Sequence, residues 1–115
     1  MTPVKPPVGI DVLDRIDIRV GTIRVVEDVP GSKKLVRLVV SFGDHTRRIL
    51  AGMKLERADV REIEGRQALF VVNLEPRVMM GETSEGMLFD IGHDDGLTPV
   101  LAVPEAAVPD GTRAG

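Results

Sequence analysis

The sequence predicts an all-β domain whose short strands close into a barrel. Three observations predict it: apolar residues alternate with polar ones over much of residues 16–51, turn-forming residues separate the apolar runs, and 43 % of the 115 residues are hydrophobic. A β-sandwich is the alternative architecture. We expect residues 1–115 to form one domain with its core at about residues 13–103, and the proline-rich start and residues 103–115 to be extensions of low complexity.

The first expected strand, residues 16–25, changes face at Gly21. Its apolar side chains occupy even positions before this glycine and odd positions after it. A bulge or sharp bend at Gly21 would produce that change of register. The strand is therefore expected to bend strongly.

Two more strands complete a meander. Residues 36–42 carry their apolar side chains on one face, and Gly43-Asp44-His45 provides a hairpin connection to residues 46–51. A short helix is expected at residues 57–64, where helix formers end at a glycine, and it would plug one end of the barrel.

The second half of the sequence supplies the remaining strands. The continuous apolar run at residues 68–72 indicates a strand buried on both sides, and residues 86–91 and 97–103 flank a turn at residues 92–96. Three strands, a helix and further strands are typical of the five-stranded OB-fold, whose ligand surface consists of strands 2 and 3 and the loops joining strands 1–2 and 4–5.

Composition excludes several classes of function. The chain has no cysteine, which removes disulfides, thiolate nucleophiles and cysteine zinc sites. The sequence offers no signal-peptide or membrane-spanning run, so a cytoplasmic protein without a membrane partner is expected. Residues 93–95, His-Asp-Asp, are better suited to a tight turn than to a metal site, and no catalytic constellation is present. We expect no enzyme activity, metal or cofactor.

Charge is distributed unevenly. The net charge is −3, but residues 31–87 hold ten bases against eight acids. An anionic partner should therefore meet this middle segment, which contains both expected ligand loops. Three arginines of strands 2 and 3 are expected to extend the basic surface: Arg37, Arg47 and Arg48.

Aromatic residues are too few for a typical single-strand binder. The chain has three phenylalanines, no tyrosine and no tryptophan, and at least two of the three are expected in the core. Single-strand binders stack bases on aromatic rings. Recognition by shape, backbone and a few polar contacts is the better expectation.

Several segments resemble the tRNA-binding domain family, which includes the C-terminal part of methionyl-tRNA synthetases, dimeric tRNA-binding proteins and the CsaA-type chaperones. Residues 17–21 read DIRVG and residues 33–35 read KKL. Residues 71–77 read VVNLEPR, and residues 84–88 read SEGML. These strings are similar to the family's opening strand, its lysine-leucine entry to strand 2, and its "VNLKPRKLMG" and "SQGM" signatures.

The resemblance implies a non-catalytic OB-fold that recognises tRNA shape, usually as a homodimer. By direct match, the central RNA-contacting positions would be Asn73, Arg77, Ser84 and Met87, with Lys33 and Lys34 as phosphate contacts. Plainer roles are open for three of these residues. Asn73 would bond local backbone, Met87 would pack in the core, and Ser84 would shape a turn.

Departures from the family pattern keep a second function open. Glu75 and Val78 replace lysines of many relatives, which should weaken phosphate binding, and residues 99–112 resemble the closing segment of the CsaA-type chaperones. The first hypothesis is tRNA binding, in trans or with a tRNA synthetase; the second is binding of unfolded or precursor polypeptides. Apolar arms at residues 8–13 and 100–108 would pair in a homodimer.

Overall fold

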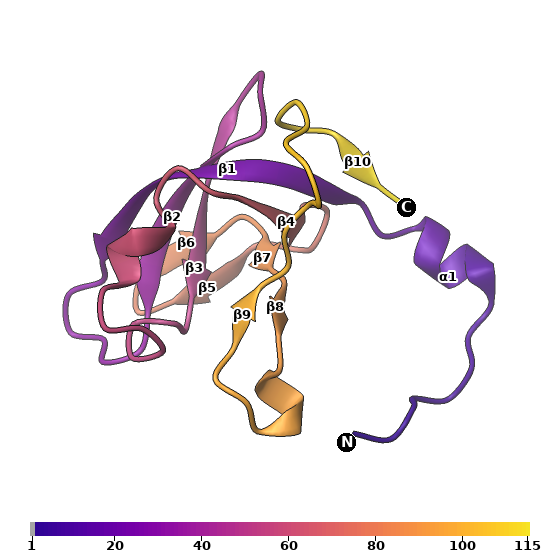
Figure 1. Ribbon diagram of the computed structural model, residues 1–115, viewed down its shortest axis with the longest axis horizontal. Coiled ribbons are helices and arrows are strands. Elements are labelled where there is room, and N and C mark those ends of the chain that lie inside the picture. Colours follow the sequence, from indigo (N-terminus) through magenta and orange to yellow (C-terminus); the bar gives the residue numbers. More distant parts are fainter. Residues whose placement is uncertain (1) are drawn as a thin grey trace.

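The computed structural model describes residues 2–115, and its main feature is a curled antiparallel sheet that forms most of a small barrel (Figure 1). The strands follow one another across the sheet in the order β3-β2-β1-β4-β7. The expected OB-type architecture is therefore confirmed. The strand bounds are β1 (Ile18–Asp28), β2 (Val36–Ser41), β3 (Thr46–Ala51), β4 (Gln67–Val71) and β7 (Met87–Leu88).

Two small hairpins stand beside this sheet. The first lies within the connection from β4 to β7 and consists of β5 (Arg77–Met79) and β6 (Glu82–Ser84). The second consists of β8 (Asp90–Ile91) and β9 (Val100–Leu101). Between β8 and β9, the 3-10 turn η2 (His93–Asp95) is flanked by Gly92 and Gly96, both at positive φ. This confirms the turn expected at residues 92–96.

The long strand β1 bends, but not where the sequence indicated. An extra residue, Arg24, shifts its pairing with β2, so the bulge lies three residues beyond Gly21. The bulge turns Val25 outward and brings Val26 into the core beside Ile23, which corrects the expected odd register. A Cβ at Gly21 would lie 2.7 Å from a methyl group of β2, so the glycine instead allows the two strands to approach closely.

The meander and its core agree with the sequence pattern. The alternate residues of β2 point inward as expected, and Phe42 and Phe70 meet edge to face with ring centroids 5.6 Å apart. The connection between β2 and β3 turns at Gly43, which has a φ of 96°. Two of the three phenylalanines therefore lie in the core, as expected.

Helical structure is shorter than expected at one position and was missed at another. Instead of a helix over residues 57–64, a 3-10 turn, η1 (Val60–Ile63), starts after Asp59, whose carboxylate accepts the N–H of Arg61 at 3.0 Å. Ile63 is fully buried, so η1 fills one end of the barrel. The helix α1 (Ile10–Asp14) was not predicted, and none of its residues is buried.

The C-terminal segment is part of the sheet. Strand β10 (Arg113–Ala114) pairs with the start of β1, and the preceding residues run beside β1 in Figure 1. Val20 of β1 donates its N–H to the carbonyl of Thr112 at 2.9 Å, and its own carbonyl accepts the N–H of Gly111 at 2.7 Å. The expected low-complexity tail thus ends in a strand that belongs to the sheet. Within residues 2–115, no helix has the length and apolar character needed to cross a membrane.

Candidate nucleic-acid interface

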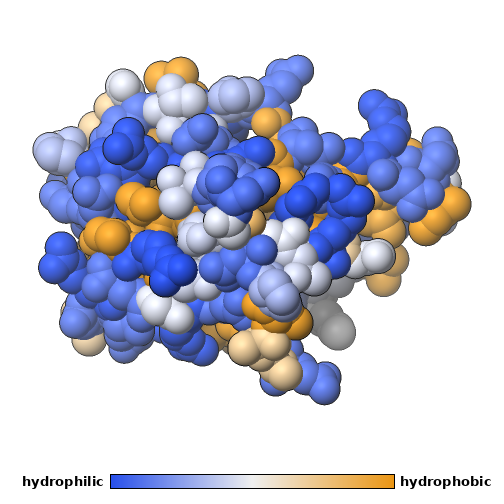
Figure 2. All heavy atoms as spheres, turned by 90° about the horizontal axis from the view of Figure 1, so that it is seen from above, coloured by the Kyte–Doolittle hydropathy of each residue, from blue (hydrophilic) through white to orange (hydrophobic). Residues whose placement is uncertain are grey.

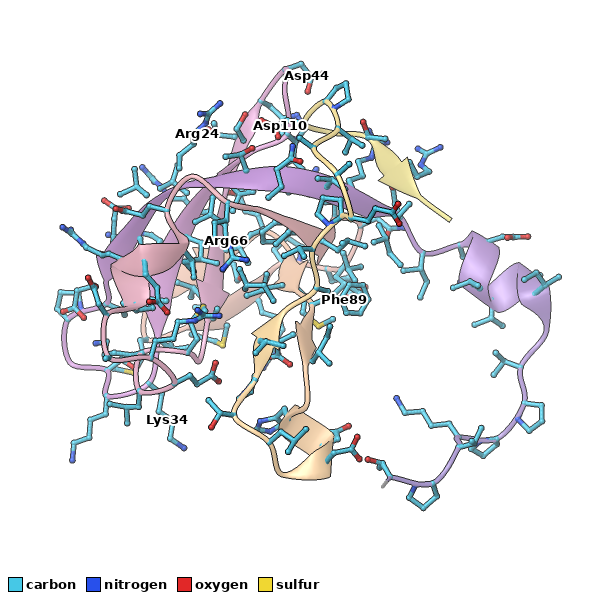
Figure 3. The ribbon with its side chains drawn as sticks, in the orientation of Figure 1. Arg24, Lys34, Asp44, Arg66, Phe89 and Asp110 are labelled. Carbon is cyan, nitrogen blue, oxygen red and sulfur yellow. The ribbon has the colours of Figure 1, made fainter. Side chains whose placement is uncertain are left out.

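The loop between β1 and β2 presents two lysines to solvent. Ser32 fixes its turn, because the Ser32 hydroxyl accepts the N–H of Lys34 at 3.3 Å and the Ser32 carbonyl accepts Lys54 Nζ at 2.6 Å. Lys33 and Lys34 are exposed and form no ion pair with any of residues 2–115. Figure 3 shows Lys34 projecting away from the barrel. These side chains are free to meet an anion.

The hairpin of β5 and β6 lies beside this loop. Its turn residues Met80 and Gly81 both have positive φ, 52° and 76°, as a tight two-residue hairpin turn requires. A Cβ on Gly31 would lie 3.6 Å from the terminal methyl carbon of Met80, so the tip of the hairpin touches the β1–β2 loop. Arg77 is exposed on this hairpin, without an ion pair among the described residues. The two loops expected to bind the ligand are therefore neighbours.

Ser84 holds the hairpin against β3. Its side chain is only 3 % exposed, and its hydroxyl accepts the N–H of Leu50 at 3.0 Å and donates to the carbonyl of Gly86 at 3.0 Å. Both hydrogen-bonding capacities of the hydroxyl are used inside the protein. Ser84 therefore acts on the position of the hairpin, on which it lies opposite Arg77.

The three arginines expected to extend the basic surface behave differently. Arg37 forms ion pairs with two glutamates, one of which is Glu82 on β6. Arg47 donates to the carbonyl of Glu85 at 3.1 Å. Only Arg48 has an exposed side chain without such a partner among residues 2–115. Hydrogen bonds to these carboxylates raise the pKa of Arg37 and pair its charge. Arg37 therefore helps to position the hairpin and is not available as a free cation.

Asn73 lies apart from the two loops, directly after β4. Its side-chain oxygen accepts the N–H of Asp17 at 2.8 Å, and its nitrogen donates to the carbonyl of Arg15 at 2.7 Å. These bonds tie the segment that enters β1 to the end of β4. Of the six candidate residues, the structure gathers four around the loops and uses the side chains of Asn73 and Ser84 internally; the four are Lys33, Lys34, Arg77 and Met87.

A groove of about 360 Å³ opens next to Arg77, and no sequence motif predicted it. Its walls come from the end of β3, both small hairpins and the loop after β3, so its residues are scattered along the chain. Of the methionines that line it, the sequence analysis considered only Met87. Burial, with the charge of Asp90 adding to it, raises the pKa of Glu56 in this groove. Other residues that line it are Leu35, Met79, Met87, Pro99 and Val100.

Together, the OB barrel and the free cations at its two ligand loops define an OB-fold binding module for an anionic ligand. The family model described as "Putative tRNA binding domain" matches residues 18–113. The chain belongs to this family. The match starts with β1 and ends at the first residue of β10, and so covers nearly the whole sheet.

Individual relatives agree with this assignment. The methionine–tRNA ligase of Chlorobium luteolum is 40 % identical over 92 residues, which are 80 % of this chain and 13 % of the ligase. A methionyl-tRNA-synthetase-related protein from Pyrococcus horikoshii is 32 % identical, with a TM-score of 0.87, covering 96 % of this chain and 100 % of that one. The chaperone CsaA of Bacillus anthracis is 25 % identical, with a TM-score of 0.82 over 96 % of this chain and 100 % of its own.

The length of the match differs between these relatives. The chain spans only 13–16 % of the length of the methionine–tRNA ligases it matches. In contrast, the match covers the full length of the structures from Pyrococcus horikoshii and Bacillus anthracis. The match to the ligases is therefore a match to one part of them.

Proposed function

We propose that the protein binds folded tRNA without catalysing a reaction, through the β1–β2 loop and the β5–β6 hairpin. The observation that carries this proposal is that Lys33, Lys34 and Arg77, on two adjoining loops, form no ion pair within residues 2–115, in a chain of a tRNA-binding family. The protein would act in the cytoplasm, in trans or with a tRNA synthetase. No metal or cofactor is needed for such binding.

The binding mode follows from the side chains at the loops. Lysine and arginine replace the counterions of phosphates, so most of the affinity is electrostatic and salt-dependent. Arg48 on β3 and the half-exposed Met87 on β7 would extend the contact beyond the loops. Phe42 and Phe70 are buried, so neither offers a ring on which an RNA base could stack. Recognition of the shape of folded RNA is therefore a better fit than binding of a single strand.

Asn73 and Ser84 would support RNA binding indirectly. Ser84 holds the hairpin that carries Arg77, and Asn73 holds the chain that enters β1. In this proposal the contacts to RNA come from Lys33, Lys34, Arg77 and Met87.

A homodimer is part of the proposal. The N-terminal arm and α1 expose apolar side chains to solvent, with Ile10 71 % and Leu13 55 % exposed. Figure 2 shows this segment as a projection, carrying both hydrophobic and hydrophilic residues, beside a mostly hydrophilic face. A helix of five residues is unstable alone. A second copy that covers it would explain its apolar composition.

Titration with RNA tests the proposal. Fluorescence anisotropy would compare labelled folded tRNA with an unstructured single strand of equal length, at 50 and 200 mM salt. We expect preference for the folded tRNA and strong weakening at the higher salt. Absence of tRNA binding at the lower salt would refute the proposal.

A second candidate function is the binding of unfolded or precursor polypeptides, as the resemblance to the CsaA-type chaperones suggests. The observation that favours it is the apolar groove between Leu35, Met79 and Met87, which would accept an apolar side chain of an extended peptide. Its test is the suppression of aggregation of a reduced, unfolded polypeptide. Tight polypeptide binding without tRNA binding would replace the first proposal by this one.

A further inference from the structure

Phosphate binding does not explain the walls of the groove beside Arg77. Met79 and Met87 both line it, and Met87 remains 43 % exposed. Thioether side chains adapt to flat rings and make favourable contacts with them. A volume of about 360 Å³ lies at the small end of ligand pockets, which range over roughly 300–1,000 Å³. The groove therefore suits one flat ring system and its sugar.

The groove is also lined by hydrogen-bond acceptors that have no donor among residues 2–115. The carboxylates of Glu56 and Asp90 both line the groove, and within residues 2–115 neither makes a side-chain hydrogen bond or an ion pair. Two carboxylates without a partner among residues 2–115 thus line the groove.

Charge restricts how an RNA strand would approach. Arg77 lines the groove, has no ion pair with any of residues 2–115, and is available to bind a phosphate. Beyond Glu56 and Asp90 the surface continues into a second hollow lined by Asp94 and Asp95, which would repel a phosphate backbone. A strand therefore cannot run through both hollows, and a single nucleotide that enters from the Arg77 side fits better.

We propose that this groove receives one unpaired RNA base and prefers guanine. The inference rests on the proposed RNA-binding function and deepens it. Guanine presents two N–H groups on its pairing edge, which a single carboxylate, that of Glu56 or Asp90, can accept together. The ring lies against Met79 and Met87, and the phosphate of the same nucleotide binds Arg77. Uracil offers a single N–H and fits less well.

The test uses a set of RNA hairpins that differ in one bulged position. The bulge is guanosine, uridine or an abasic residue, and anisotropy titrations give the three affinities. We expect the guanosine hairpin to bind about tenfold more tightly than the abasic one, with uridine between them. At least one of the two amide variants, Glu56→Gln and Asp90→Asn, should reduce this ratio several-fold, and an unchanged ratio in both would overturn the base site. Glu105→Gln removes an exposed carboxylate that does not line the groove, and it should leave the ratio unchanged.

Each contrary outcome points to a different failure. Equal binding of the three hairpins, with tRNA binding intact, overturns the base site and leaves the proposed function standing. No binding to any RNA overturns both. If Met79→Ala weakens binding of an unfolded polypeptide but leaves the guanosine-to-abasic ratio unchanged, the groove is a peptide site and the inference is wrong. Thermal melting of each variant confirms that the comparison is made on folded protein.

Discussion

Ser84 on β6 and Leu50 on β3 are joined by a hydrogen bond of 3.0 Å, in which the buried hydroxyl oxygen accepts the backbone N–H. This bond helps to close the barrel between β3 and the hairpin. Arg77 lies directly across the hairpin from Ser84. The position of an exposed cation therefore depends on a hydroxyl group that solvent does not reach.

Replacement of Ser84 by alanine should impair both stability and RNA binding. The change leaves the N–H of Leu50 buried without an acceptor, at a cost of about 1–3 kcal/mol in the free energy of unfolding. It also releases the hairpin, so we expect tRNA affinity to fall several-fold. Urea denaturation and tRNA titration measure the two effects. Thr83→Ala, on the exposed face of the same strand, is the control, and equal effects of the two variants would contradict this role of Ser84.

Replacement of Arg77 by alanine should weaken tRNA binding without affecting the fold, because its side chain is exposed and unpaired among the described residues. Loss of one phosphate contact should reduce the slope of log K against log salt by about 1. Titrations at four salt concentrations measure the slope. Arg66→Ala removes an equal charge beside the C-terminal segment and should leave the slope unchanged. An unchanged slope for Arg77→Ala would exclude it as a phosphate ligand.

Lysines at positions 75 and 78 should strengthen tRNA binding. Glu75 and Val78 are exposed at the hairpin and its entry, beside Arg77 in the sequence. Val78→Lys adds one cation and should steepen the salt slope by about 1, and Glu75→Lys should also remove a repulsive charge. Val78→Gln controls for the loss of the apolar side chain. A lack of gain in the double lysine variant would indicate that RNA does not reach this hairpin.

The oligomeric state can be tested at α1. Light scattering after gel filtration should give a mass of about twice 12.5 kDa. The double variant Ile10→Asp, Leu13→Asp places charges on the exposed apolar residues and should give a monomer. Asp14→Asn, on the same helix, should remain dimeric. A wild-type mass near 12.5 kDa would refute the dimer.

Asp110 should make the attachment of the C-terminal segment sensitive to acid. Burial alone would raise its pKa, but hydrogen bonds from Thr22 (2.6 Å) and Gln67 (3.0 Å) and the nearby charge of Arg24 outweigh burial and hold the pKa below its ordinary value. Figure 3 shows Arg24 and Asp110 on the same side of β1. The folded pKa is thus below the unfolded value of about 3.9, so this stabilisation is present above about pH 4 and is lost as the pH falls through the folded pKa.

The measurement is the difference in unfolding free energy between wild type and Asp110→Asn as a function of pH. We expect about 1–2 kcal/mol at pH 7 and a smaller difference below pH 4. Asp94→Asn, at an exposed carboxylate, serves as the control. A difference that stays constant from pH 7 to pH 3 would show that the charge of Asp110 does not hold the segment.

The sequence predicted those parts of the fold that depend on burial of apolar side chains. The β2 pattern and Phe70 identified the meander and the core because alternation reports directly which face is buried. Strand β10 was missed because polar groups hold its segment: Gln67 donates to the carbonyl of Val108 at 2.6 Å and Asp110 accepts from Thr22. Hydrogen bonds between side chains and residues more than 40 positions away leave no periodic pattern in the sequence.

The candidate site was predictable in position but not in detail. Lys34 and Arg77 lie on the loops where the sequence placed them, and their role in binding stays a prediction. The internal use of the Ser84 hydroxyl depends on the approach of β3, which no local pattern reports. For the same reason the ion pair of Arg37 with Glu82 was not anticipated. The bulge at Arg24 likewise reflects strand pairing, which the positions of apolar residues indicated only approximately.

The pairing of β1 with residues 110–114 has a consequence for synthesis on the ribosome. Residues 18–20 are translated early, but their partners on one edge are made more than 90 residues later: Ile18 pairs with Ala114, and Arg19 with Arg113. Vectorial folding of the nascent chain must therefore leave that edge of β1 open until nearly the whole sequence has emerged. During this interval the edge is a template for unwanted strand addition, and chaperone protection would matter most then.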